Sequence, residues 1–135
     1  MVLDASAAAG AAPAARSVRA VRGAVQLDAD EREHLLASTR ELVTGVLEAN
    51  GLSTDDLVSI MFTCTPDLTS EFPAVAAREL GLGDVPLMCA VEVDVVGAMP
   101  RVVRLMALAE TALARSEVQH VYLRGAVALR RDIAQ

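Results

Sequence analysis

Residues 18–27, Val-Arg-Ala-Val-Arg-Gly-Ala-Val-Gln-Leu, alternate between two sets of side chains in the manner of a β-strand. Val21, Val25 and Leu27 fall on one face of such a strand. Arg22 falls on the other face, because successive side chains of a strand point to opposite sides. The alternation therefore predicts a strand that turns Arg22 away from the Val21/Val25 face.

A helix is expected next, because Asp28 and Glu31 are spaced like a capping box and Gly51 stands where a helix commonly ends. Residues 99–114 are ambiguous, since their apolar periodicity alone would favour a helix. The other expected elements are a helical turn from Ser53, a strand at 58–65, a helix that begins at Pro73 and is closed by Gly81 or Gly83, a strand from Pro86 to Val93 and a strand at 119–129. This alternation predicts a single α/β (α+β) domain in which helices pack on a mixed sheet.

The composition restricts both the core and the partners. Hydrophobic residues make up 53% of the 135 residues and aromatic residues only 2%, so small aliphatic side chains must fill the core. Such side chains bury little area each, and association with further copies would add buried surface. The net charge of −6 argues against a nucleic acid or a membrane as partner, because nucleic acids and anionic membranes both require a basic surface.

The two cysteines, Cys64 and Cys89, are expected to be reduced thiols of a cytoplasmic protein. No metal is expected, because the cysteines and histidines lack the paired close spacing of zinc ligands, and no cofactor motif is present. Residues 1–16 are rich in alanine and predict a disordered N-terminal extension ahead of one domain at 17–135. A signal peptide is the less favoured alternative, because Asp4 stands where a basic residue would be needed.

Six short frames follow one another along the chain. They are Val-Arg-Gly-Ala (21–24), Cys-Thr-Pro-Asp-Leu (64–68), Glu-Phe-Pro-Ala (71–74), Cys-Ala-Val-Glu-Val-Asp-Val (89–95), Arg-Val-Val-Arg-Leu-Met (101–106) and His-Val-Tyr-Leu (120–123). In this order they resemble the monofunctional AroH-class chorismate mutases, over residues 18–132. The resemblance implies a homotrimer arranged as a pseudo-α/β-barrel. It also implies a short helical lead-in followed by a strand that carries Arg104.

The reaction implied by the resemblance is the Claisen rearrangement of chorismate to prephenate, a step of aromatic amino-acid biosynthesis at a branch of the shikimate pathway. No proton moves in this step. An enzyme therefore helps by holding a flexible dianion in its compact conformer and by placing positive charge at the breaking ether oxygen. Arginine suits both tasks, because it stays charged and its planar fork matches a carboxylate.

The resemblance assigns one role to each matching residue. Arg104 would contact a carboxylate and the ether oxygen, and Arg22 would be the second carboxylate-side arginine. Glu92 would accept the substrate hydroxyl, and Tyr122 would donate to a carboxylate. Further substrate-binding positions are implied at Phe72, Arg78, Met88, Cys89, Ala90, Val91, Leu129 and Arg130. The family often has a lysine where Val75 stands, so one outer cation is missing from this chain.

Other interpretations are open at this stage. Arg22 and Arg104 lie in apolar, strand-like stretches, so either could form a structural ion pair with Glu92 or Asp94 instead. The alternative functions are a trimeric enamine-deaminase-like enzyme of similar architecture and a non-catalytic binder of carboxylate metabolites. The combination of Glu92, Arg104 and Tyr122 favours the mutase, because the sequence shows no water-activating frame of the kind a deaminase needs.

Overall fold

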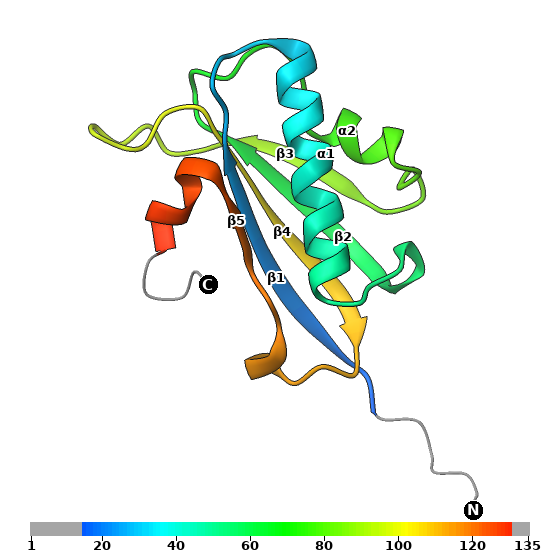
Figure 1. Cartoon of the computed structure of the whole chain (residues 1–135). Coiled ribbons are helices and arrows are strands. Elements are labelled where there is room, and N and C mark those ends of the chain that lie inside the picture. Colours follow the sequence, from blue (N-terminus) through cyan, green and yellow to red (C-terminus); the bar gives the residue numbers. More distant parts are fainter. Residues whose placement is uncertain (1–14, 131–135) are drawn as a thin grey trace, which may run out of the picture.

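A mixed five-stranded sheet with the strand order β3-β2-β4-β1-β5 forms the centre of residues 15–130, the part of the chain that the computed structural model describes (Figure 1). The strands and α-helices of this part are β1 (Ser17–Gln26), α1 (Arg32–Ala49), β2 (Leu57–Cys64), α2 (Ala74–Glu79), β3 (Leu87–Val91), β4 (Val102–Thr111) and β5 (Val121–Leu123). Short 3-10 helices lie at Thr54–Asp56, Arg115–Glu117 and Arg124–Arg130. The predicted class, helices packed on a mixed sheet, is confirmed.

The sheet contains both parallel and antiparallel pairs. β4 runs antiparallel to β1 and β2, whereas β3 is parallel to β2 and β5 is parallel to β1. β1 and β4 are paired along their whole length, from Ser17 opposite Thr111 to Gln26 opposite Val102. Because directly opposed residues share a face, this register decides which side chains of the two central strands meet.

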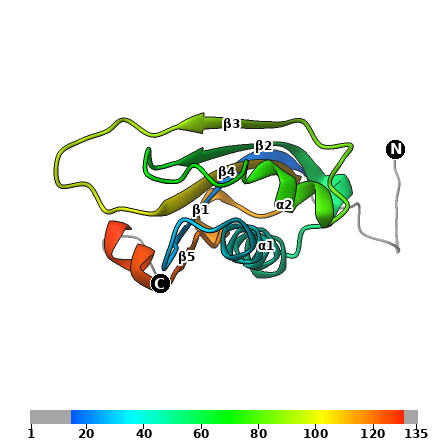
Figure 2. The same cartoon turned by 90° about the horizontal axis from the view of Figure 1, so that it is seen from above.

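The helices α1 and α2 pack against one face of the sheet and share a single apolar core with it (Figures 1 and 2). Val21 and Val25 of β1 are buried in this core, on the face that their alternation predicted. A Cβ atom on Gly23, between them, would lie only 3.1 Å from Leu42 Cδ1 and 3.2 Å from Val46 Cγ2. Glycine at this position therefore lets α1 approach β1 closely.

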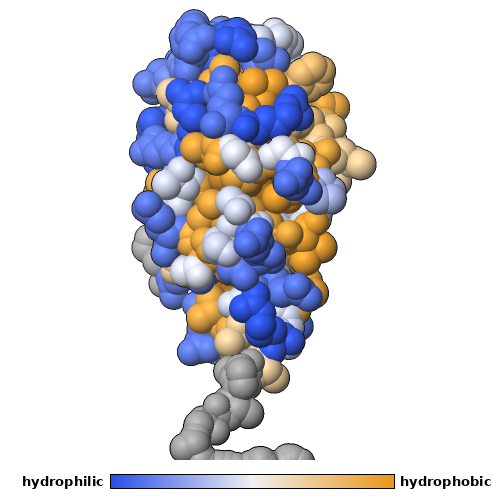
Figure 3. Space-filling view, turned by 90° about the vertical axis from the view of Figure 1, so that its right-hand side faces the viewer, coloured by the Kyte–Doolittle hydropathy of each residue, from blue (hydrophilic) through white to orange (hydrophobic). Residues whose placement is uncertain are grey.

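The other face of the sheet carries no α-helix among the described residues. One end of it is covered by the 3-10 helix Arg124–Arg130, where Ala126 packs against Ala24 and Val102. The exposed large apolar side chains on this face are Val18, Met61, Met88 and Met106. Apolar side chains also reach the surface on the side of the molecule that Figure 3 shows.

The loop between β3 and β4 extends away from the body of the sheet (Figures 1 and 2). The side chains of Val93 and Val96 are almost completely exposed in this loop. Arg101 ends the loop with a left-handed backbone, at φ 56°. Its backbone N–H donates to Asp67, which fixes the point where β4 begins. Within residues 15–130, no helix is both long and apolar enough to cross a bilayer.

Three local predictions are wrong. The helical lead-in expected from residue 99 is absent, since residues 99–101 are not helical and Arg101 has a left-handed backbone, although the strand that carries Arg104 follows as predicted. The cap of α1 is Glu31 itself, whose carboxylate accepts two backbone N–H groups, so the expected box with Asp28 does not form. The last strand ends at Leu123, because Arg124 adopts φ 56° and turns the chain into a 3-10 helix.

Candidate active site

A cavity of about 490 Å³ opens on the sheet face that no α-helix covers. Its lining residues are Arg22, Gly23, Ser59, Met61, Thr63, Glu92, Arg104, Leu105, Met106, Leu108 and Tyr122. Four side chains that the sequence singled out, Arg22, Glu92, Arg104 and Tyr122, therefore meet in one place. They come from β1, from the loop after β3, from β4 and from β5.

Strand pairing explains why these side chains converge. Arg104 lies opposite Ala24 of β1 and opposite Thr63 of β2, so it occupies the middle of the sheet. Ala24 is in turn paired with Tyr122 of β5. Ala24 therefore lies between Arg104 and Tyr122 in the sheet, and the side chains on either side of it both line the cavity.

Arg104 and Glu92 form a loose ion pair. The Arg104 Nε atom lies 3.4 Å from Glu92 Oε2, and the two side chains are 42% and 26% exposed. Nε itself is buried and makes no hydrogen bond within residues 15–130, because the contact with Glu92 has the distance of an ion pair but not the geometry of a hydrogen bond. A buried N–H that lacks an acceptor is costly, so this group is ready to donate to an acceptor that enters the cavity.

The position of Glu92 is set by two contacts. Its backbone N–H donates to the carbonyl oxygen of Cys64 at 2.8 Å, which joins the end of β2 to the start of the loop after β3. The hydroxyl of Thr63 donates to Glu92 Oε2. Thr63 was not identified from the sequence. A threonine in an apolar strand gives no local signal, and the register opposite Arg104 is the feature that distinguishes it.

Arg22 and Tyr122 are held by the pairing of β1 with β5. The backbone N–H of Arg22 donates to Nδ1 of His120 at 3.0 Å, just before β5 begins. Tyr122 is half-buried and packs on the small cluster around Ala24, together with Leu129. Tyr122 thus packs on this cluster and also lines the cavity.

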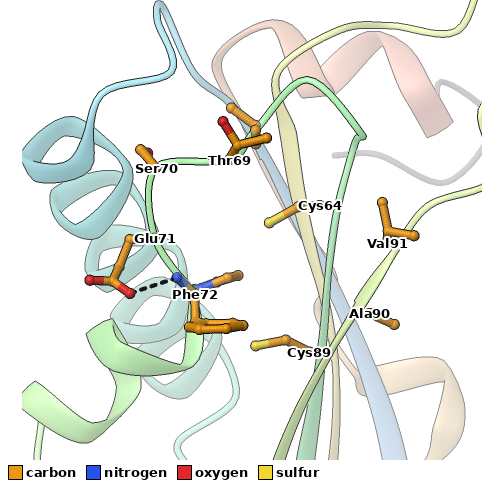
Figure 4. A pocket seen from close by; sticks show the side chains of 10 residues that line it. Cys64, Thr69, Ser70, Glu71, Phe72, Cys89, Ala90 and Val91 are labelled. Atoms are coloured by element: carbon orange, nitrogen blue, oxygen red, sulfur yellow. Dashed lines mark hydrogen bonds between the residues drawn. The ribbon is translucent and has the colours of Figure 1, made fainter.

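A second cavity, of about 400 Å³, lies beside β3 and the segment that leads into α2 (Figure 4). Phe72, Cys89, Ala90 and Val91 contribute to it. Cys89 is paired with the buried Phe62, so it lies on the helix-covered face, not beside Glu92 in the first cavity. In Figure 4 the ring of Phe72 lies over the sulfur of Cys89.

The other lining cysteine of the second cavity, Cys64, is a poor nucleophile. Burial raises the pKa of the Cys64 thiol to about 12, with the charges of nearby acidic groups adding to the effect. The thiol is therefore neutral at physiological pH. Within residues 15–130, no group of three or more His, Cys, Asp or Glu side chains is placed to hold a metal ion.

Two arginines, a carboxylate and a phenol in a cavity that is otherwise lined mostly by apolar side chains suit a small dianion that also carries a hydroxyl. The family described as chorismate mutase type I matches residues 18–133. The chain belongs to this family. The chorismate mutase AroH of Thermus thermophilus is 50% identical over 117 residues, which cover 86% of this chain and 96% of that protein.

More distant chorismate mutases agree with this assignment. The chorismate mutase AroH of Bacillus subtilis is 36% identical over 118 residues, which cover 87% of this chain and 93% of the relative. A solved chorismate mutase from Clostridium thermocellum superposes with a TM-score of 0.80 at 39% identity, over 81% of this chain and 97% of that one. The chain and these relatives therefore share a fold as well as a sequence pattern.

The remaining positions expected for a chorismate mutase are spread over the surface. Arg78 lies in the last turn of α2, and Met88 is exposed on β3 opposite Met61. Val75, where the family often has lysine, packs against the main core. The backbone of Arg130 ends the last 3-10 helix, and its side chain lies outside the part that the structure describes.

Proposed function

We propose that this chorismate mutase converts chorismate to prephenate with Arg104 as its main electrostatic catalyst. The observation that carries the proposal is the place of Arg104, which lines one cavity with Arg22, Glu92 and Tyr122 and whose buried Nε–H lacks a hydrogen-bond partner in residues 15–130. The activity is that of the family to which the chain belongs. The roles of the individual residues are inferred from their geometry.

Negative charge grows on the ether oxygen as its bond to carbon breaks. A guanidinium aimed at that oxygen stabilises the transition state more than the substrate, which is the condition for a higher turnover number. Arg104 can donate to the ether oxygen and to a neighbouring carboxylate at once, because its donors lie in one plane. Arg22 and Tyr122 would bind carboxylate oxygens, and these contacts select the compact conformer of the substrate.

Glu92 would accept a hydrogen bond from the substrate hydroxyl. The Claisen step transfers no proton, so Glu92 is required for orientation and not as a general base. Its carboxylate lies close enough to Arg104 to bring the hydroxyl and the ether oxygen of one small molecule to two neighbouring groups. This pairing of an acceptor with a cation distinguishes the mutase from a simple binder of dicarboxylates.

The enzyme is proposed to act as a homotrimer that forms a pseudo-α/β-barrel. The exposed methionines on the helix-free face of the sheet, Met61, Met88 and Met106, support an interface there, since a monomer rarely leaves such a set open to water. Phe72 is 66% exposed beside the second cavity, on the other side of the sheet from Arg104. We infer that Phe72, Arg78 and Cys89 of one subunit complete the cavity of its neighbour.

The proposed location is the cytoplasm. Cys64 and Cys89 are both free thiols and are not paired with each other in the structure. Free thiols persist in reducing compartments.

One assay tests the activity and the role of Arg104 together. Loss of chorismate is followed by its absorbance with the purified enzyme, with Arg104→Ala and with the control Arg40→Ala. Arg40 is a cation on α1 that pairs with Glu79 of α2, and neither residue lines the cavity. We expect Arg40→Ala to match the native enzyme and Arg104→Ala to lose at least a hundredfold in turnover, as is typical of a removed oxyanion donor (roughly 10²–10³). A native enzyme that leaves chorismate intact would refute the activity.

Light scattering during the same experiment tests the assembly. A fully active monomer at micromolar concentration would contradict the site shared between subunits.

A further inference from the structure

Thr63 lines the cavity and contacts Glu92, but it has not yet been given a part in the reaction. It lies in β2, directly opposite Arg104 of β4 and paired with Ala90 of β3 on its other side. Its hydroxyl donates to Glu92 Oε2, and the Arg104 Nε atom lies 3.4 Å from that same oxygen. A neutral donor and a cation thus approach one oxygen of the Glu92 carboxylate.

We propose that Thr63 is a positioning residue that holds Glu92 in its working orientation. By binding Oε2, it keeps Glu92 Oε1 available to accept the substrate hydroxyl. It also prevents the carboxylate from closing onto Arg104. This inference rests on the proposed function, because it concerns the roles of Glu92 and Arg104 in that reaction.

The geometry gives the physical reason. Glu92 stands at the start of the loop after β3, and its backbone is tied to β2 by one hydrogen bond to Cys64. Its side chain has three rotatable bonds, and the nearest opposite charge is that of Arg104. Without a competing donor, the carboxylate would be drawn toward the guanidinium. The present contact has ion-pair distance but no hydrogen bond, which is the state that the Thr63 hydroxyl maintains.

A direct hydrogen-bonded ion pair between Glu92 and Arg104 would lower turnover. The charge of Arg104 would be partly neutralised, and its Nε–H would be occupied by Glu92 instead of by the substrate. The stabilisation of the ether oxygen would weaken, and this contribution appears in turnover more than in substrate binding. A threonine without a role in the site would affect only the stability of the fold.

The central test compares Thr63→Val, which keeps the shape but removes the hydroxyl, with Thr63→Ser, which keeps the hydroxyl. Turnover number, Michaelis constant and melting temperature are measured for each. We expect Thr63→Val to lose roughly tenfold in turnover, as for a hydrogen bond to a charged group, with less than about a threefold change in the Michaelis constant. Thr63→Ser should stay within about threefold of the native enzyme. Thr44→Val on α1 is the matched control and should behave like the native enzyme.

A double-mutant cycle with Glu92→Ala tests whether Thr63 acts through Glu92. In that background Thr63 has no carboxylate to hold, so adding Thr63→Val should change turnover less than about twofold. An equal loss in both backgrounds would overturn the inference, because Thr63 would then act by another route.

Two further results would also overturn it. One is native turnover in Thr63→Val, and the other is a lowered melting temperature with unchanged turnover, which would mark Thr63 as structural only. The proposed function would survive either result, provided that Arg104→Ala is impaired. If the native enzyme leaves chorismate intact, the proposed function fails, and the inference about Thr63 fails with it.

Discussion

The role of Arg104 can be tested most sharply by removing its charge and keeping its shape. Replacement by the neutral isostere, Arg104→citrulline, retains a planar donor group in nearly the same volume. Two unit charges about 4 Å apart interact by roughly 4 kcal/mol at the effective dielectric constant of a protein surface, and the ether oxygen develops only part of a unit charge. Because 42% of the Arg104 side chain is exposed, we take the lower end of the range measured for oxyanion donors.

This estimate corresponds to about 2.7 kcal/mol, or roughly a hundredfold loss in turnover for Arg104→citrulline. Steady-state kinetics of chorismate loss would measure turnover and the Michaelis constant separately. Arg104→Lys is the companion variant, since it keeps the charge but loses the fork that reaches two acceptors. A citrulline enzyme with near-native turnover and only a raised Michaelis constant would refute the electrostatic role and leave Arg104 as a binding residue.

Three further predictions concern other parts of the molecule. Glu92→Gln keeps an acceptor and should retain part of the turnover, whereas Glu92→Ala should lose much more; two equally inactive variants in the chorismate assay would instead favour a role for the charge. Arg16 was predicted to belong to the disordered extension at residues 1–16, but its side chain binds Asp56 at 2.6 Å, and residues 1–14 lie outside the part of the chain that the structure describes. Deletion of residues 1–15 should therefore leave turnover and melting temperature nearly unchanged, and a fall in either quantity would show that the deleted residues contact the fold. The pKa of Asp56 is lowered by the Ser53 N–H and by Arg16, and the pKa of Glu71 is lowered by the Phe72 N–H and by Arg32. Both carboxylates therefore stabilise the fold above their unfolded pKa of about 4. This stabilisation is lost as the pH falls through their lower pKa values in the folded protein. The contribution of these two carboxylates to the melting temperature should therefore be constant from pH 8 to about pH 5 and be lost below about pH 4. Glu71→Gln should make the melting temperature less sensitive to acid.

Much of the fold could be predicted from local sequence signals. The alternation in residues 18–27 gave the first strand and the face that it buries, and Gly51 ends α1 with a left-handed backbone as expected. β4 is the instructive case. Val102 and Val103 are both fully buried, so an alternating pattern is absent at its start and periodicity alone suggested a helix. Burial on both sides arises from tertiary packing, which a single strand does not reveal.

Part of the candidate site could also be predicted from local motifs, and part of it depends on strand pairing. Four site residues each lie in a short motif of their own, and the structure brings all four into one cavity: Arg22, Glu92, Arg104 and Tyr122. Cys89 was expected to contact the same substrate as Glu92, but strand pairing places it on the other face of the sheet. Thr63 was missed for the related reason that its importance depends on a register between strands. Register follows from long-range packing and cannot be read from one segment.

The place of β1 in the sheet has a consequence for synthesis of the chain. Its two neighbours, β4 and β5, are the last strands to be made, since they begin at Val102 and Val121. A ribosome adding roughly 5–20 residues per second leaves β1 without either partner for roughly 4–15 s. During that time α1 can cover one face of β1, but both edges stay open to other nascent chains. We therefore expect the yield of native enzyme to depend on chaperones and on growth temperature. The activity of the enzyme, once it has folded, should not depend on either.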